Sequence, residues 1–105
     1  LVHEATFTTE DLERAVETRH STAAEAATLA RDAGVRMLAL NHISTRVHPR
    51  EVKEEARRVF PQAVVPRDFD QVEIPFRERG APRLVPAAER LGRSEAPATV
   101  PGATL

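Results

Sequence analysis

The sequence predicts a small α/β fold with a parallel sheet, because apolar strand-like runs alternate with amphipathic helical patterns. The clearest strand is the apolar run 35–40, which follows Gly34 and stops abruptly at Asn41. A helical pattern over 49–59 and a second apolar run at 63–65 come next. Strand, helix and strand in this short span form a βαβ unit, which we expect to be right-handed.

The segment before this strand is expected to hold one strand and two helices. Residues 1–5 form the end of a strand, and a threonine at 8–9 then caps a short helix that gives way near Arg19. The second helix begins with the Thr-x-x-Glu spacing of a capping box at 22–25, and its alanines form a small-residue face that can lie close to a sheet. Gly34 ends this helix as a left-handed cap.

Prolines mark the boundaries after the central strand. Pro49 suits the first position of the next helix, and Pro61 terminates that helix. The segment 66–70 is expected to be a turn, and 72–75 a final edge strand bounded by proline.

The last part of the sequence lacks the pattern of a packed domain. Apolar periodicity fades after Phe76, so roughly three quarters of the chain can contribute to a core. Residues 77–105 are rich in Pro, Ala and Arg and show little periodicity apart from a short turn at 87–91. We therefore expect a disordered C-terminal tail.

Composition excludes several classes of protein. The chain has 105 residues and a net charge of -1 with both signs interspersed, which argues against a broad nucleic-acid or anionic-membrane surface. It has no cysteine, so His, Asp or Glu must hold any metal. No segment reaches the length of a membrane span and the first residues lack the basic-then-apolar pattern of a signal peptide, so we expect a cytoplasmic protein without a membrane partner. Because the sequence starts at Leu1, within a strand-like run and without an initiator Met, we expect a fragment of a longer protein, and an alternative start codon is the other interpretation.

Three polar side chains are expected to converge at the carboxyl edge of the predicted sheet. Glu4 ends the first strand, His20 precedes a helix, and His42 follows the central strand. A histidine held by a carboxylate can act as general acid or base, and a histidine in a strand-end loop can ligate zinc. The alternative is an ordinary polar contact between Glu4 and His20, with His42 in a structural hydrogen bond. His48, next to Pro49, is expected to cap a helix or to be exposed.

These side chains belong to three short motifs. The motifs are HEATF at 3–7, HSTA at 20–23 and HISTR at 42–46, followed by Phe60-Pro61 and the strand VEIP at 72–75. In this order and at these separations they resemble the C-terminal part of ribonuclease Z, the tRNA 3′-processing endoribonuclease of the metallo-β-lactamase superfamily.

The resemblance covers residues 1–76 and implies roles for single side chains. His42 resembles a zinc ligand of a two-metal centre, and Glu4 with His20 resembles the pair that delivers a proton to the leaving 3′ oxygen. Two metals generate a hydroxide and stabilise charge at phosphorus, while a protonated histidine eases expulsion of the alkoxide. The residues that the resemblance implies in substrate binding near the cut are Arg46, Ser21 and Thr22.

The resemblance also implies the properties of a longer protein. That protein would be a homodimeric, metal-dependent endoribonuclease that removes the 3′ trailer from precursor tRNA. It would fold as a four-layer αβ/βα sandwich, of which this chain supplies the C-terminal half. The family's main metal motif, His-x-His-x-Asp-His, does not occur in this chain, which therefore offers at most one ligand for the two expected zinc ions. We expect the chain alone to be inactive.

Three positions depart from the family pattern. Arg19 stands where Gly usually precedes the second motif, Asn41 where Thr precedes the zinc histidine, and Val47 where an aromatic residue is common. These departures leave open a metallo-β-lactamase-fold hydrolase that acts on another phosphoester or ester. A non-catalytic remnant of a truncated gene is the other alternative.

Overall fold

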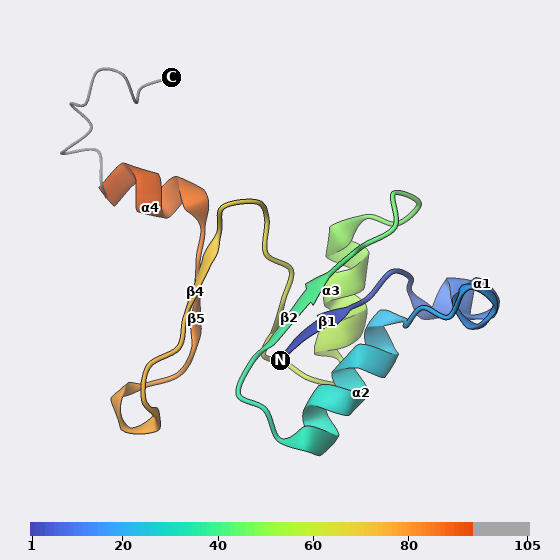
Figure 1. Cartoon of the computed structure of the whole chain (residues 1–105), viewed down its shortest axis with the longest axis horizontal. Helices are drawn as coiled ribbons and strands as arrows, with labels where there is room; N and C mark the ends of the chain where they lie inside the picture. The colour runs from blue at the N-terminus through green and yellow to red at the C-terminus, as the bar shows by residue number, and fades with distance from the viewer. Residues whose placement is uncertain (94–105) are drawn as a thin grey trace. The chain divides into compact units, whose positions relative to one another are not determined.

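The protein consists of two compact units (Figure 1). The computed structural model describes residues 1–93. The first unit spans Leu1–Val65, and the second begins at Pro66. The predicted division at residue 76 concerns the complete domain and stays a prediction.

A three-stranded parallel sheet forms the centre of the first unit. Its strands are β1 (Val2–Glu4), β2 (Leu38–Asn41) and β3 (Ala63–Val64), in the spatial order β1-β2-β3. Both pairings are parallel, so the carboxyl ends of the strands lie at one edge of the sheet. The predicted α/β class with a parallel sheet is confirmed.

Helices connect these strands and cover one face of the sheet. A 3₁₀ turn, η1 (Thr9–Asp11), α1 (Leu12–Thr18) and α2 (Ala23–Ala33) lie between β1 and β2, and α3 (Pro49–Arg57) leads to β3. The helices α2 and α3 contact each other and the sheet (Figure 1). The small side chains on α2 allow this close approach, as the sequence predicts. The core between helices and sheet includes Ala23, Ala26, Ala27, Ala30, Leu38, Leu40, Val52 and Ala56.

Local sequence signals set both ends of α2 and the start of α3 as predicted. The Thr22 hydroxyl accepts a hydrogen bond from the N–H of Glu25, whose carboxylate accepts one from the N–H of Thr22, which completes the capping box. Gly34 ends α2 in the left-handed conformation with φ of 68°. His48 caps α3, because its Nδ1 accepts the N–H of Arg50. The predicted threonine cap of the first helix is wrong, because Thr8 makes no side-chain capping hydrogen bond before η1 and Asp11 precedes α1.

The central strand begins later than the apolar run predicts. β2 begins at Leu38 rather than at Val35. The N–H of Val35 donates to the carbonyl of Ala30, so the end of α2 holds this residue. Residues 35–37 therefore connect the helix to the strand instead of extending the sheet.

The second unit contains an antiparallel hairpin. Its strands β4 (Gln71–Glu73) and β5 (Arg83–Val85) pair with each other, with a 3₁₀ turn η2 (Arg77–Arg79) between them and α4 (Ala87–Arg93) after them. The predicted final strand thus exists, but it pairs within the second unit rather than with the parallel sheet.

The structure differs from the expected disordered tail over residues 77–93. This stretch contains η2, β5 and α4. The strand β5 has only three residues, which is too short to produce apolar periodicity in the sequence. Residues 94–105, on which the rest of that prediction falls, lie outside the described residues. No helix within residues 1–93 combines the length and the apolar character needed to cross a membrane.

Candidate metal and acid–base site

Two of the predicted site residues lie at the carboxyl ends of neighbouring parallel strands. Glu4 ends β1 and pairs with Asn41 at the end of β2. His42 follows directly with φ of 56°, a left-handed conformation that few non-glycine residues adopt. The N–H of Ser44 donates to the carbonyl of Thr6, which holds the loop after β2 against the segment after β1. The His42 ring is thereby brought to the end of β1, with Nδ1 2.8 Å from Thr6 Oγ1.

His20 reaches the same edge of the sheet through a separate turn. Arg19 ends α1 with φ of 62°, which redirects the chain toward the segment after β1. The N–H of Phe7 donates to the carbonyl of Ser21, and its carbonyl accepts the N–H of Ala23. The Phe7 and His20 rings then pack edge to face, with centroids 6.3 Å apart.

Glu4 is held as a carboxylate by several donors. Its Oε2 accepts the N–H and the hydroxyl of Thr6 at 3.0 and 2.7 Å, and its Oε1 accepts the N–H of Ser21 at 2.6 Å. Oε1 also lies 3.5 Å from His20 Nδ1. Burial by itself raises the pKa of Glu4, but the hydrogen bonds from Thr6 and Ser21 and the nearby His20 together bring it below its ordinary value. An ionised Glu4 is therefore available to orient the His20 ring.

The two histidine rings stack on each other beside this carboxylate. Their centroids are 5.1 Å apart and their planes differ by 25°. One ligand atom from each of Glu4, His20 and His42 lies within 4.8 Å of the others. His42 is exposed, and the side chains of Glu4 and His20 keep 28% and 35% of their surface exposed. The three residues predicted to converge are brought together.

Thr6 is a fourth member of this site, and the sequence predicts no role for it. Its hydroxyl oxygen lies within hydrogen-bond distance of Glu4, His20 and His42. The sequence signals that could have indicated it are its place in the HEATF motif and in the polar turn two residues after Glu4. Glu4, Thr6, His20 and His42 are called the Glu4 cluster below.

The three predicted substrate-binding residues differ in how close they lie to the Glu4 cluster and in how exposed their side chains are. The N–H of Ser21 donates to Glu4, so this residue adjoins the Glu4 cluster. Arg46 Nη2 lies 3.9 Å from Asp11 Oδ1, and the Arg46 side chain is 55% exposed. Thr22 is 1% exposed and its hydroxyl caps α2, so substrate contact through the Thr22 side chain does not fit this structure.

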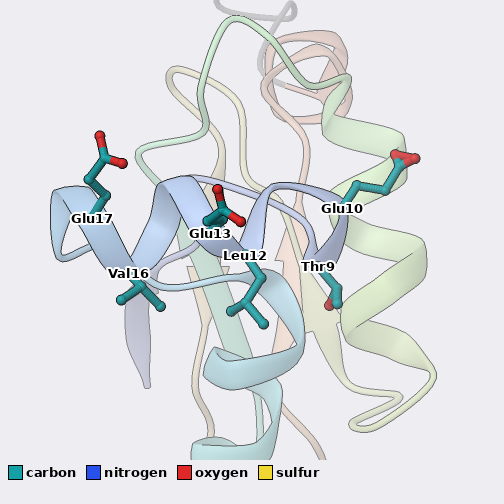
Figure 2. A pocket seen from close by; sticks show the side chains of 6 residues that line it. All are labelled: Thr9, Glu10, Leu12, Glu13, Val16 and Glu17. Atoms are coloured by element: carbon teal, nitrogen blue, oxygen red, sulfur yellow. The ribbon is translucent and has the colours of Figure 1, made fainter.

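A surface hollow over η1 and α1 lies apart from these residues (Figure 2). Leu12 and Val16 are 43% and 70% exposed and point to one side of α1, while Glu13 and Glu17 point to the other (Figure 2). Carboxylates around an apolar surface repel a phosphodiester, so this hollow does not suit a nucleic acid. Its lining, which includes no member of the Glu4 cluster, is Thr9, Glu10, Leu12, Glu13, Val16 and Glu17.

Among the side chains of the Glu4 cluster, His42 best fits the role of a metal ligand. Its Nδ1 is hydrogen-bonded to the Thr6 hydroxyl, an arrangement that leaves Nε2 for a metal ion. Glu4, His20 and His42 could instead hold one ion together. That arrangement would cost Glu4 its hydrogen bonds from Thr6 and Ser21, so the paired acid–base arrangement of Glu4 and His20 fits better.

The fold and the site define an α/β protein with a histidine–carboxylate centre suited to metal-assisted or acid–base hydrolysis. No protein-family model matches the chain. Its sequence is 59% identical over 74 residues to the ribonuclease Z of Methanopyrus kandleri, 52% over 79 residues to that of Haloferax volcanii and 44% over 90 residues to that of Salinibacter ruber. These matches cover 70%, 72% and 85% of this chain.

The similarity places the chain in the ribonuclease Z family, as a homologue of part of that enzyme. The same matches cover 26%, 25% and 28% of the three relatives, so the chain spans about a quarter of the length of the curated relatives that it matches. The chain is thus related to a hydrolase, and the resemblance carried by its three motifs is confirmed.

Proposed function

We propose that this chain forms the C-terminal part of a metal-dependent endoribonuclease that removes the 3′ trailer from precursor tRNA by hydrolysing a phosphodiester. Similarity to ribonucleases Z from several organisms supports this class of enzyme. The observation that carries the proposal is the juxtaposition, in the Glu4 cluster, of a carboxylate-held histidine and a second histidine suited to a metal.

In the complete domain, residues 1–76 supply one half of an αβ/βα sandwich. Two features support this arrangement. The helices α2 and α3 cover one face of the sheet, whereas Val2 in β1 is 69% exposed. β1 is also an edge strand of the sheet that the structure describes, so a further strand can pair with it. The complete enzyme is proposed to be a cytoplasmic homodimer that contains two zinc ions.

His42 and the pair of Glu4 and His20 have separate roles in this proposal. His42 would hold one metal ion through Nε2, and the other ligands belong to parts of the enzyme outside this chain. A bound metal of this kind supplies a hydroxide and neutralises charge at phosphorus. Glu4 orients His20 through Nδ1, and His20 donates a proton from Nε2 to the leaving 3′ oxygen.

Arg46 and Ser21 are proposed to meet the RNA near the cut. The Arg46 side chain is more than half exposed, and its 3.9 Å ion pair with Asp11 is long, so an RNA phosphate can displace Asp11. Ser21 follows His20 in the chain and adjoins Glu4, which places it beside the reacting groups. The buried Thr22 is left out of this role.

A chimeric enzyme tests the proposed function. In this chimera, the 74-residue matched segment of the Methanopyrus kandleri ribonuclease Z is replaced by its counterpart from this chain. We expect the chimera to cleave precursor tRNA at its 3′ side and to lose this activity when a chelator removes the metal. The 105-residue chain alone is the matched control, and we expect no cleavage by it.

Two results would contradict the proposal. A chimera that hydrolyses a small phosphodiester but not precursor tRNA would indicate a related hydrolase with another substrate. A folded, zinc-loaded chimera that hydrolyses neither would indicate that this sequence is a non-catalytic remnant. Chelator-sensitive cleavage by the chain alone would show that it needs no further metal ligands, against the division of ligands proposed above.

A further inference from the structure

The Thr6 hydroxyl lies at the centre of the Glu4 cluster although it carries no charge. Thr6 is 5% exposed, and its Oγ1 lies 2.7 Å from Glu4 Oε2, 2.8 Å from His42 Nδ1 and 3.3 Å from His20 Nδ1. A threonine hydroxyl has one proton to donate and two lone pairs that accept. It can therefore donate to one of these three partners and must accept from the others.

The ionised Glu4 determines the direction of each of these hydrogen bonds. Its carboxylate accepts the N–H groups of Thr6 and Ser21, and its pKa lies below the ordinary value, so it can only accept. The Thr6 hydroxyl proton is therefore directed to Glu4. The Thr6 oxygen is then an acceptor for both histidines, and the second neighbour of His20 Nδ1, Glu4 Oε1, is an acceptor as well.

We propose that Thr6 is a positioning residue whose hydroxyl holds His42, and together with Glu4 holds His20, in the tautomer that carries its proton on Nδ1. The consequence for catalysis rests on the proposed function, whereas the tautomers follow from the hydrogen bonds alone. For His42, this tautomer leaves the Nε2 lone pair to a metal ion. For His20, it makes Nε2 the atom that takes up and releases the transferred proton.

Two substitutions separate the hydroxyl from the shape of the side chain. Serine keeps the hydroxyl, so Thr6→Ser retains one donor and two acceptor sites. Valine has nearly the shape of threonine but no hydroxyl, so Thr6→Val removes the acceptor of His42 Nδ1 and one of the two acceptors of His20 Nδ1 while filling the same space. The comparison of the two variants isolates the hydrogen bonds of Thr6 from its packing.

The experiment measures which ring nitrogen carries the proton in the metal-free 105-residue chain. Two-bond proton–nitrogen correlation spectra distinguish the two tautomers when recorded well above the ordinary histidine pKa of about 6.5. We expect the proton on Nδ1 for His20 and His42 in the wild-type chain and in Thr6→Ser. In Thr6→Val we expect the His42 ring to become a mixture of the two tautomers, whereas His20 keeps Glu4 Oε1 as an acceptor for its Nδ1 proton.

The other two histidines of the chain serve as internal controls. His48 Nδ1 accepts the N–H of Arg50, so its neutral ring carries the proton on Nε2, the opposite tautomer. His3 Nδ1 donates to the carbonyl of Glu4, independently of the Thr6 hydroxyl. Neither ring is expected to change in the Thr6 variants, so a change confined to His42 identifies a local effect.

The wild-type spectrum alone can overturn the proposal. A His42 ring with its proton on Nε2 would contradict it before any variant is made, and an unchanged His42 tautomer in Thr6→Val would contradict it as well. In the chimera, we expect Thr6→Val to weaken zinc binding about 10- to 100-fold and Thr6→Ser to bind zinc as the wild type does. An inactive chimera together with the expected tautomers in the chain would refute the proposed function and leave the role of Thr6 intact.

Discussion

Glu4 at the edge of the parallel sheet and Asp70 in the second unit are held in similar ways. Each carboxylate accepts two backbone N–H groups, one from a nearby residue and one from a residue 17 positions further along the chain. The donors are Thr6 and Ser21 for Glu4, and Arg67 and Ala87 for Asp70. Both carboxylates therefore fasten two segments of backbone.

The two sites differ in the side chains that meet the carboxylate. At Asp70 the N–H groups of Arg67 and Ala87 lower the pKa, and the hydrogen bonds close the turn before β4 and start α4. At Glu4, a threonine hydroxyl and two histidines also lie beside the carboxylate. A carboxylate held by backbone donors thus serves structure by default, and it gains a chemical role where side chains that can transfer protons meet it.

The largest expected difference between the two carboxylate sites is in catalysis. We expect His20→Ala in the chimera to lower kcat/KM for precursor tRNA by about 10²- to 10⁴-fold, because it removes the proposed general acid. Asp70→Asn is the matched control and should leave cleavage unchanged. An equal loss in both variants would contradict a catalytic role that distinguishes the Glu4 site from the Asp70 site.

A second difference is expected in stability. Glu4→Gln replaces one carboxylate oxygen by an NH₂ group that cannot accept the N–H groups directed at Glu4. We expect urea denaturation to show a loss of about 1 to 3 kcal/mol in the free energy of unfolding. Asp70→Asn should cost less, because water can replace the lost hydrogen bonds at the more exposed site. A larger loss for Asp70→Asn would reverse the order of the two sites.

The lowered pKa of Glu4 predicts how stability depends on pH. In the unfolded chain Glu4 titrates near its ordinary value of about 4.3, and in the folded chain below it. The folded state therefore favours the ionised form, and this contribution is complete above the ordinary value and is lost as pH falls through the folded pKa. Urea denaturation at decreasing pH should show this loss in the wild type and a smaller one in Glu4→Gln. Identical pH profiles would contradict the assignment.

The smallest expected effect concerns the two left-handed helix ends, one leading into the site and one into β2. Arg19 has φ of 62° and Gly34 has φ of 68°. Arg19 stands at the position where the sequence pattern of the family leads us to expect Gly. We expect Arg19→Gly to stabilise the chain by about 0.5 to 1 kcal/mol. Gly34→Ala should destabilise it by about 1 kcal/mol through the backbone alone, because an added Cβ would meet no atom within 4 Å. Thermal unfolding of both variants measures these effects, and a destabilised Arg19→Gly would show that the Arg19 side chain matters.

Local hydrogen bonds explain which parts of the fold the sequence could predict. The capping box at Thr22, the left-handed Gly34 and the first-position Pro49 act within one helical turn, so neighbouring residues suffice to identify them. The sequence does not predict the hairpin partner β5, because a strand of three residues carries no periodic signal and depends on its pairing with β4.

Three members of the site could be predicted from the sequence, but Thr6 and the hydrogen bonds that join the four side chains could not. Glu4 and His42 converge because the carboxyl ends of parallel strands share an edge, which follows from the element order. Thr6 could not be identified this way, because its hydrogen bonds reach His20 and His42 across 14 and 36 residues. The buried position of Thr22 likewise depends on the packing of α2, which its motif alone does not reveal.

The most direct test compares two exposed histidines, His42 and His48, in the chimera. The measurement is zinc content by elemental analysis together with the rate of precursor tRNA cleavage, for His42→Ala, His48→Ala and the unmodified chimera. We expect His42→Ala to lose bound zinc and to cleave at least about 100-fold more slowly. His48→Ala should keep both properties and lose only about 1 kcal/mol of stability, because His48 caps α3. Full zinc content and full cleavage in His42→Ala would contradict the assignment of this edge of the sheet as the metal and acid–base site.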